Sequence, residues 1–150
     1  MRKYVAFFLL LAFACGFAGC AFPTGPDFKD FSAYKDDFSL VRDCLLAQDF
    51  FQNSTDHILV NLNSDIAEVI DVEAETKDAL LASVARLCAK GFNYVILDPD
   101  YMIFWEDETG YYGVLWTQKP IKALKFIKEK SRDFKRIDRE WYEVGVLDSI

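Results

Sequence analysis

Histidine and cysteine, the side chains that most often carry nucleophilic or metal chemistry, are scarce in this sequence. His57 is the only histidine, and Cys44 and Cys88 are the only cysteines in the body of the chain. A zinc site needs several spaced ligands, and a cysteine nucleophile needs a histidine beside an accessible thiol. Both cysteines fall beside the apolar stripe of an expected helix, where thiols are inert. We therefore assign no catalytic residue, no metal and no cofactor, and interpret His57 as a residue that begins a strand.

Acidic residues gather at two predicted turns, Asp98–Asp100 and Asp107–Gly110, which invites comparison with calcium or glycosidase sites. The strand expected between them, Tyr101–Glu106, would span about 17–20 Å. Carboxylates at its two ends are too far apart to form one site or a glycosidase pair. We interpret both turns as solvated hairpin tips.

A disulfide is the second use that cysteine could have here. A bridge between Cys44 and Cys88 would close a loop of about 45 residues, worth roughly 4 kcal/mol in the chain-entropy model. The alternative is a pair of buried free thiols that pack as small hydrophobic groups.

Aromatic residues on two consecutive strands form the candidate binding face. If Glu106 pairs with Tyr111, one face of this hairpin carries Tyr101, Ile103, Trp105, Tyr112, Val114 and Trp116. Exposed patches rich in Trp and Tyr usually mark interaction sites. The functional interpretation is a platform for a protein or a sugar chain. The alternative is a core face that a helix or the N-terminal segment covers.

Hydrophobic periodicity predicts an α+β fold, in which about three helices pack on an antiparallel sheet that contains a three-stranded meander. Apolar spacings of three and four predict helices over residues 28–51, 76–90 and 120–132, with Thr76 as the N-cap of the second. Strands are expected over residues 57–63, 66–72, 92–97, 101–106, 111–118 and 137–147. The chain has room for one domain.

A targeting segment occupies the first nineteen residues. Arg2 and Lys3 supply a positive start, and Tyr4–Ala14 is an unbroken apolar run. Cleavage after Ala14 would suit a site of the small-x-small kind. Alternatively, the uncharged stretch Tyr4–Phe22 is just long enough to remain as an uncleaved anchor.

A third interpretation rests on the run Phe17-Ala18-Gly19-Cys20. This run resembles the lipobox of bacterial lipoproteins, in which a small residue precedes an invariant cysteine, although Leu, Val or Ile is usual where Phe17 stands. The resemblance covers only the N-terminus. It implies a signal peptide over residues 1–19, lipid on Cys20, a tether over residues 20–27 and a single domain over residues 28–150. All three interpretations place that domain outside the cytoplasm.

Charge narrows the choice of partners. Without Arg2 and Lys3 the chain has 15 basic against 24 acidic residues, a net charge of −9. This balance argues against nucleic acid and against adhesion to an anionic membrane surface. Residues 119–150 hold 9 basic and 6 acidic groups, which form either a basic patch or partners for acidic neighbours in the same domain.

These features favour a small binding module of the bacterial envelope, attached to the membrane through its N-terminal lipid. Its partner would be an envelope protein, as for an immunity or inhibitor lipoprotein. The alternatives are an accessory lipoprotein that binds cell-wall glycan through the same aromatic residues, and a hydrolase without a recognisable motif. We expect Trp105 and Trp116 to be accessible to solvent, and burial of both would contradict a binding module that recognises a protein through this aromatic face.

Overall fold

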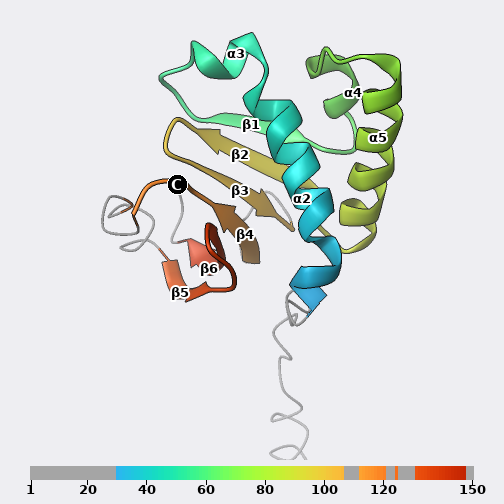
Figure 1. Ribbon diagram of the computed structural model, residues 1–150. Helices are drawn as coiled ribbons and strands as arrows, with labels where there is room; N and C mark the ends of the chain where they lie inside the picture. The colour runs from blue at the N-terminus through green and yellow to red at the C-terminus, as the bar shows by residue number, and fades with distance from the viewer. Residues whose placement is uncertain (1–29, 107–111, 121–123, 125–130, 148–150) are drawn as a thin grey trace, which may run out of the picture.

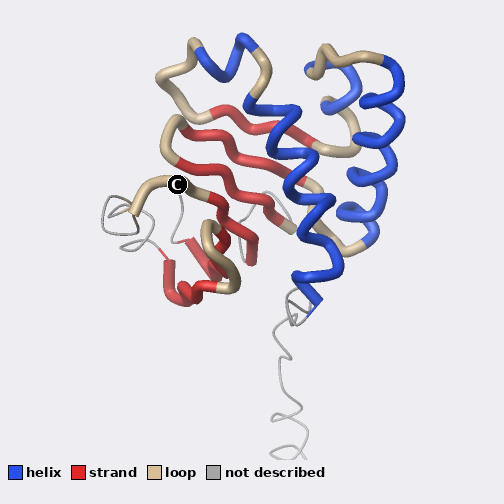
Figure 2. The backbone as a smooth tube through the Cα atoms, in the orientation of Figure 1, coloured by secondary structure: helices blue, strands red, loops and turns tan. Residues whose placement is uncertain are grey.

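The computed structural model describes residues 30–106, 112–120, 124 and 131–147. Its strands form one antiparallel sheet, and two long helices share a core with one face of that sheet (Figures 1 and 2). The elements are α2 (Phe31–Leu46), α3 (Asp49–Gln52), β1 (Ile58–Asn61), α4 (Ile66–Val69), α5 (Ala74–Ala89), β2 (Tyr94–Asp98), β3 (Tyr101–Trp105), β4 (Tyr112–Trp116), β5 (Ser131–Arg136) and β6 (Trp141–Leu147). The predicted α+β class is confirmed.

The described strands lie in the order β1-β2-β3-β4-β6-β5, and every neighbouring pair is antiparallel. β2, β3 and β4 form the predicted meander. β2 and β3 are joined by a tight turn, because Asp98 pairs with Tyr101 across only two intervening residues. β1 extends the meander at one edge, and the β5–β6 hairpin extends it at the other.

α2 buries the face that its apolar spacing predicts. Phe38, Val41 and Leu45 are buried, and Tyr34 is half-buried against the same core. The helix ends at Leu46, so the expectation of one helix to residue 51 is wrong. The chain continues as the short helix α3, and the buried Gln48 between them receives a hydrogen bond from the Asp71 amide at 3.0 Å.

α5 also forms where expected, with Leu80, Val84 and Leu87 buried. It begins at Ala74, which places Thr76 inside the first turn, so the predicted N-cap is wrong. Gly91 follows the helix with a φ of 98°. This left-handed conformation costs glycine little and is the usual way to end a helix.

An ion pair between a buried carboxylate and an exposed guanidinium joins the two long helices. Asp37 of α2 is 6% exposed and accepts hydrogen bonds from the guanidinium of Arg86 on α5, whose Nε lies 3.0 Å from Asp37 Oδ2. Ser83 Oγ also accepts a bond from this guanidinium, at 3.1 Å. The Arg86 hydrogen bonds hold the pKa of Asp37 below its usual value, against the opposing effect of burial.

The strand predicted over residues 66–72 is wrong, because a turn and a short helix occupy its place. Asp65 Oδ2 accepts a hydrogen bond from the Asn61 amide at 3.0 Å, and the Asp65 amide donates to the Asn61 carbonyl at 2.9 Å. These bonds reverse the chain directly after β1. α4 then buries Ile66, and Ile70 after it is buried too, which the spacing of four in a helix allows.

The C-terminal third differs most from expectation. Residues 121–123 and 125–130 of the predicted third helix lie outside the described residues, but its predicted end is wrong because Ser131 begins β5. The expected final strand starts later than predicted, at Trp141, and Ile137 belongs to the connection that precedes it. Apolar spacing alone did not reveal β5, whose sequence SRDFKR contains one apolar residue.

Two clusters of buried side chains lie on opposite faces of the sheet. The larger is on the face that α2 and α5 cover, here called the helix face, and includes Met102, Phe104 and Trp141. The smaller is on the opposite face, here called the open face, and includes Ile103, Leu115 and Leu124. The chain therefore buries apolar residues on both sides of its meander.

Candidate functional site

The predicted six-residue aromatic face does not exist, because the register of β3 and β4 differs from the prediction by one residue. Trp105 pairs with Gly113 instead of Tyr112, and Ile103 pairs with Leu115. Paired residues share a face, so a shift of one residue moves a whole strand to the other side. Tyr101, Ile103 and Trp105 lie on the open face, whereas Tyr112, Val114 and Trp116 lie on the helix face.

Both tryptophans of that prediction are also buried, which contradicts the expected exposure. Trp105 is 1% exposed and Trp116 is 7% exposed. Trp116 packs against α2, where the Arg42 guanidinium lies 5.0 Å from its ring centroid, and its Nε1 donates to Glu140 Oε2 at 3.2 Å. Trp105 shares the open-face cluster with Leu124. These rings are core, and they offer no platform to a ligand.

Cys44 and Cys88, the two cysteines among the described residues, are free thiols. Cys44 is buried and Cys88 is half-buried, and both belong to the core between the helices and the sheet. Burial raises the pKa of each thiol, and the nearby carboxylate of Asp43 adds to the effect at Cys44. Of the two alternatives considered, the free thiols are the one found.

Part of the open face is accessible at the edge of the sheet. Leu59 of β1 is 57% exposed and pairs with Ile96 of β2, which is half-buried, as is Tyr94 beside it. We call Leu59, Tyr94 and Ile96 the open margin. Through Ile103, the pairing partner of Ile96 on β3, the margin continues into the buried cluster of this face.

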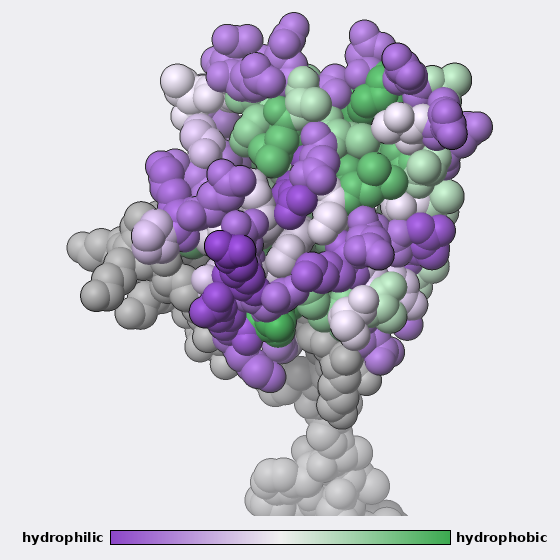
Figure 3. All heavy atoms as spheres, in the orientation of Figure 1, coloured by the Kyte–Doolittle hydropathy of each residue, from purple (hydrophilic) through white to green (hydrophobic). Residues whose placement is uncertain are grey.

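The other exposed large hydrophobic side chains of the described residues lie on helices: Phe50 on α3 is 36% exposed and Leu81 on α5 is 38% exposed. Figure 3 is drawn in the orientation of Figure 1, with α2 in front of the sheet. Hydrophilic side chains cover much of this surface, and hydrophobic groups show between α2 and α5 in its upper half.

The outer backbone edge of β1 is partly closed. The register and the bond from the Leu62 amide to the Asn93 carbonyl indicate that Val60 and Leu62 direct their backbone groups toward β2. Asn61 therefore points its groups outward, and both are occupied by Asp65. Such closure is typical of edge strands that avoid adding another strand. A partner would meet the side chains of the open margin more readily than the edge itself.

A row of polar side chains borders the open margin. The register of β1 and β2, continued by one residue beyond the Ile58–Leu97 pair, places His57 opposite Asp98. His57 Nδ1 lies 3.2 Å from Asp98 Oδ2 and 3.4 Å from the Tyr101 hydroxyl. The histidine side chain is 48% exposed, and that of Asp98 is 17% exposed. Burial, followed by the carboxylates of Asp98 and Asp100, raises the pKa of the Tyr101 phenol, which therefore stays protonated.

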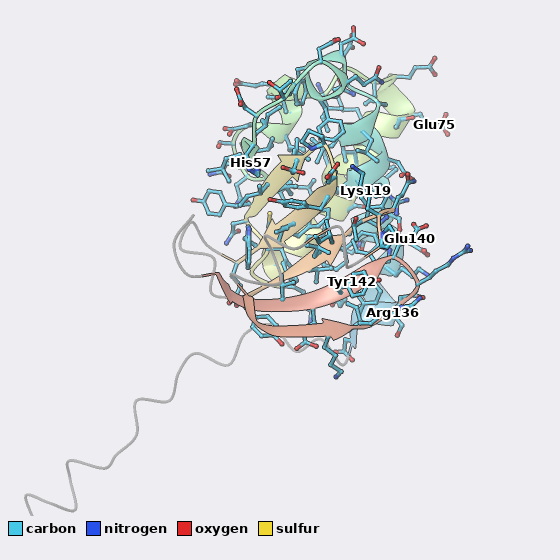
Figure 4. The ribbon with its side chains drawn as sticks, turned by 90° about the vertical axis from the view of Figure 1, so that its left-hand side faces the viewer. His57, Glu75, Lys119, Arg136, Glu140 and Tyr142 are labelled. Carbon is cyan, nitrogen blue, oxygen red and sulfur yellow. The ribbon has the colours of Figure 1, made fainter. Side chains whose placement is uncertain are left out.

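A second ion pair lies beside this row. Lys119 Nζ contacts Asp100 Oδ1, and Thr117 Oγ1 donates to the Asp100 carbonyl at 2.8 Å. Thr117 Oγ1 also accepts a bond from the Lys119 amide at 3.1 Å. Figure 4 labels both His57 and Lys119 in the upper half of the molecule. Asp98 and Asp100, interpreted from sequence as solvated hairpin tips, are both engaged.

The chemistry open to this group is limited. A neutral His57 that donates from Nδ1 to Asp98 keeps Nε2 as a hydrogen-bond acceptor, and a protonated ring can donate from both nitrogens. In the part of the chain that the structure describes, no group of three or more His, Cys, Asp or Glu side chains is placed to hold a metal ion. The arrangement is suited to polar recognition at the end of an apolar surface.

Sequence reasoning missed this group. His57 was interpreted only as a residue that begins a strand, and the turn at Asp98 only as a solvated tip. One signal could have found it, namely the pairing of the two apolar strands β1 and β2. Once these strands are aligned as antiparallel neighbours, His57 before β1 lies next to Asp98 at the end of β2.

Comparison of this chain with known proteins found no match. No protein-family model matches the chain, and no curated protein or solved structure matches it. Cys20 and the predicted targeting segment lie outside the described residues, as does the turn predicted over residues 107–110. Within the described ranges, no helix has the length and hydropathy needed to cross a bilayer.

Proposed function

We propose that this protein is an extracytoplasmic binding module, attached to a bacterial membrane by lipid on Cys20, that holds a partner protein against its open margin. The exposure of Leu59 is the observation that carries the proposal. Antiparallel sheets that face solvent on one side usually place polar residues there. A leucine that is 57% exposed at the middle of β1 departs from this pattern.

The surroundings of Leu59 support a docking role over an isolated surface leucine. Ile96 and Tyr94 lie next to it on the paired strand, and both are only half-buried. They are held by a sheet whose next strand, β3, is buried throughout. Rigid apolar groups with a polar border are what protein interfaces use at their centres. His57 and Asp98 supply that border.

The protein and glycan hypotheses both relied on the six-residue aromatic face, whose members lie on two sides of the sheet. The open margin favours a protein over a glycan, because two of its three residues, Leu59 and Ile96, are aliphatic and offer no ring on which a sugar could stack. The hydrolase alternative depended on the acidic turns and His57. That histidine has Asp98 as a carboxylate partner. The hydroxyl within reach of His57 in the described part of the chain is the Tyr101 phenol, whose pKa burial raises, so it is a poor nucleophile. A protein partner therefore remains the function that the open margin fits best.

Site-specific photo-crosslinking in cells of the source organism tests this proposal. A photoreactive phenylalanine derivative is placed at position 59, and in a matched control at position 81, where Leu81 is a leucine exposed on α5. We expect a covalent adduct of defined mass from position 59 and none from position 81. Absence of an adduct at position 59, or the same adducts at both positions, would overturn the proposal.

The lipid tether is tested separately. Cells that express the full chain are labelled with radioactive palmitate, and the protein is recovered with the membrane fraction. We expect label on the wild type and none on Cys20→Ser, with Cys15→Ser as the control that keeps its label. Label that persists in Cys20→Ser, or a wild type without label, would refute lipidation at this position.

A further inference from the structure

The surface beside the open margin is acidic. Asp56 is exposed and directly precedes His57, Asp98 lies opposite His57, and Asp100 follows in the β2–β3 turn. Lys119 is the cation that pairs with Asp100. With His57 neutral, these side chains carry three carboxylates against one ammonium, a net charge of −2.

The strands that carry the margin have no cationic side chain of their own. Residues 56–61 and 94–105, which include β1, β2 and β3, contain 3 acidic and no basic residues. The Tyr101 phenol adds no charge, because burial raises its pKa. A potential of one sign over such a region attracts groups of the opposite sign and repels like ones.

We infer that the partner held at the open margin presents a cationic segment, rich in Lys or Arg, next to an apolar side chain that covers Leu59. This inference rests on the proposed function and adds the chemistry of its partner. The partner's apolar side chain would bury Leu59 and Ile96, and its cationic groups would lie over the carboxylates of Asp56 and Asp98. Complementary charge of this kind sets partner choice and association rate more than it adds affinity.

The same argument excludes an acidic protein segment as the partner, since its carboxylates would face Asp56 and Asp98 at short range. Nucleic acids and anionic lipid surfaces are excluded as partners for the same reason, because they also carry negative charge. The cation could come from lysine or arginine, which share the charge but differ in how they bind a carboxylate.

Two synthetic peptides serve as probes: one alternates leucine with lysine, and the other alternates leucine with glutamate. Each carries a fluorophore, and binding to residues 21–150 is followed by fluorescence anisotropy. We expect the lysine peptide to bind and the glutamate peptide not to bind. Raising NaCl from about 0.05 M to about 0.5 M shortens the screening length severalfold and should weaken the complex.

Variants locate the site. Leu59→Asn removes the apolar contact, while Asp56→Asn and Asp98→Asn each remove one carboxylate. We expect each charge change to raise the Kd about two- to fivefold, which is the usual range for an exposed ion pair. Glu75→Gln is the matched control, because Glu75 is an exposed carboxylate on α5 and lies across the molecule from His57 in Figure 4.

Equal binding of the two peptides, or failure of the lysine peptide to bind, would overturn the inference. So would an effect of both aspartate variants no larger than that of Glu75→Gln. The Asp56 variant keeps the test decisive if Asp98→Asn disturbs the fold. The crosslink at position 59 does not depend on charge, so it separates the failure of this inference from that of the proposed function.

Discussion

Trp105 of β3 lies over Gly113, its pairing partner on β4. A Cβ at position 113 would stand 2.6 Å from the Phe104 carbonyl oxygen and 2.6 Å from Cε3 of the Trp105 ring. Such distances are shorter than packed atoms tolerate, and one of the obstructing atoms is backbone. The glycine is therefore required by the ring across from it, as when an aromatic side chain covers a glycine on a neighbouring strand.

Gly113→Ala should consequently destabilise the fold. Overpacking of this kind costs about 1–3 kcal/mol. We expect the urea midpoint of residues 21–150 to fall with little change in the slope of the transition. Gln118→Ala, an exposed change just beyond the same strand, is the control. An alanine variant as stable as the wild type would show that the strands can separate locally and that Trp105 does not define the register.

The same contact explains why the sequence predicted the meander but not its register. Alternating apolar runs and turn residues identified β2, β3 and β4 correctly. The register then depended on pairing Glu106 with Tyr111, a symmetrical choice that placed Trp105 opposite Tyr112. Hydrophobic alternation could not distinguish the two registers, because both faces of this hairpin are apolar and a shift by one residue exchanges one apolar face for another.

The contact between His57 and Asp98 could not be predicted from the sequence, for a different reason. His57 and Asp98 are 41 residues apart, and only the pairing of β1 with β2 brings them together. Local patterns predict elements, whereas the neighbours of an edge strand depend on the whole topology. A strand over residues 66–72, as predicted, could have paired with β2 in place of β1. Because residues 66–69 form α4 instead, the sequence prediction did not identify β1 as the neighbour of β2 and did not bring His57 next to Asp98.

The ion pair between Asp37 and Arg86 should make stability depend on pH. The pKa of Asp37 is lowered in the folded state, chiefly by hydrogen bonds from Arg86. A lowered pKa contributes stability above the carboxyl's unfolded value, about 4, and that contribution is lost as pH falls through the folded value. Asp37→Asn should therefore destabilise the fold at pH 7, and the deficit should shrink below pH 4. Urea unfolding of both proteins at several pH values measures this difference.

Asp36→Asn is the matched control for that series, because Asp36 is the neighbouring carboxylate on α2 and is exposed. Its stability should follow the wild type across the whole range. A deficit of Asp37→Asn that stays constant from pH 7 to pH 3 would mean that the variant acts through packing alone. Such a result would remove the ionic contribution assigned to Arg86.

The free thiols predict slow modification in the native state. Burial raises the pKa of Cys44 and Cys88, and only the thiolate reacts with disulfide reagents. Residues 21–150 should show little reaction at neutral pH and two reactive thiols after unfolding in urea. Mass spectrometry after alkylation counts them. Recovery of no thiols from unfolded, unreduced protein would show that the cysteines are bridged.

A permanent positive charge at position 57 should weaken the binding of the lysine peptide. His57 faces Asp98 of β2 and Tyr101 of β3, and Asp56 precedes it in the chain. The ammonium group of a His57→Lys variant would compete with the peptide for Asp98, and the local net charge would change from −2 to −1. We expect the Kd of His57→Lys to be about two- to fivefold higher than that of the wild type. His57→Asn, which adds no charge, is the control and should change the Kd much less. A His57→Lys variant that binds the peptide as tightly as His57→Asn would show that a cation at position 57 does not compete for Asp98.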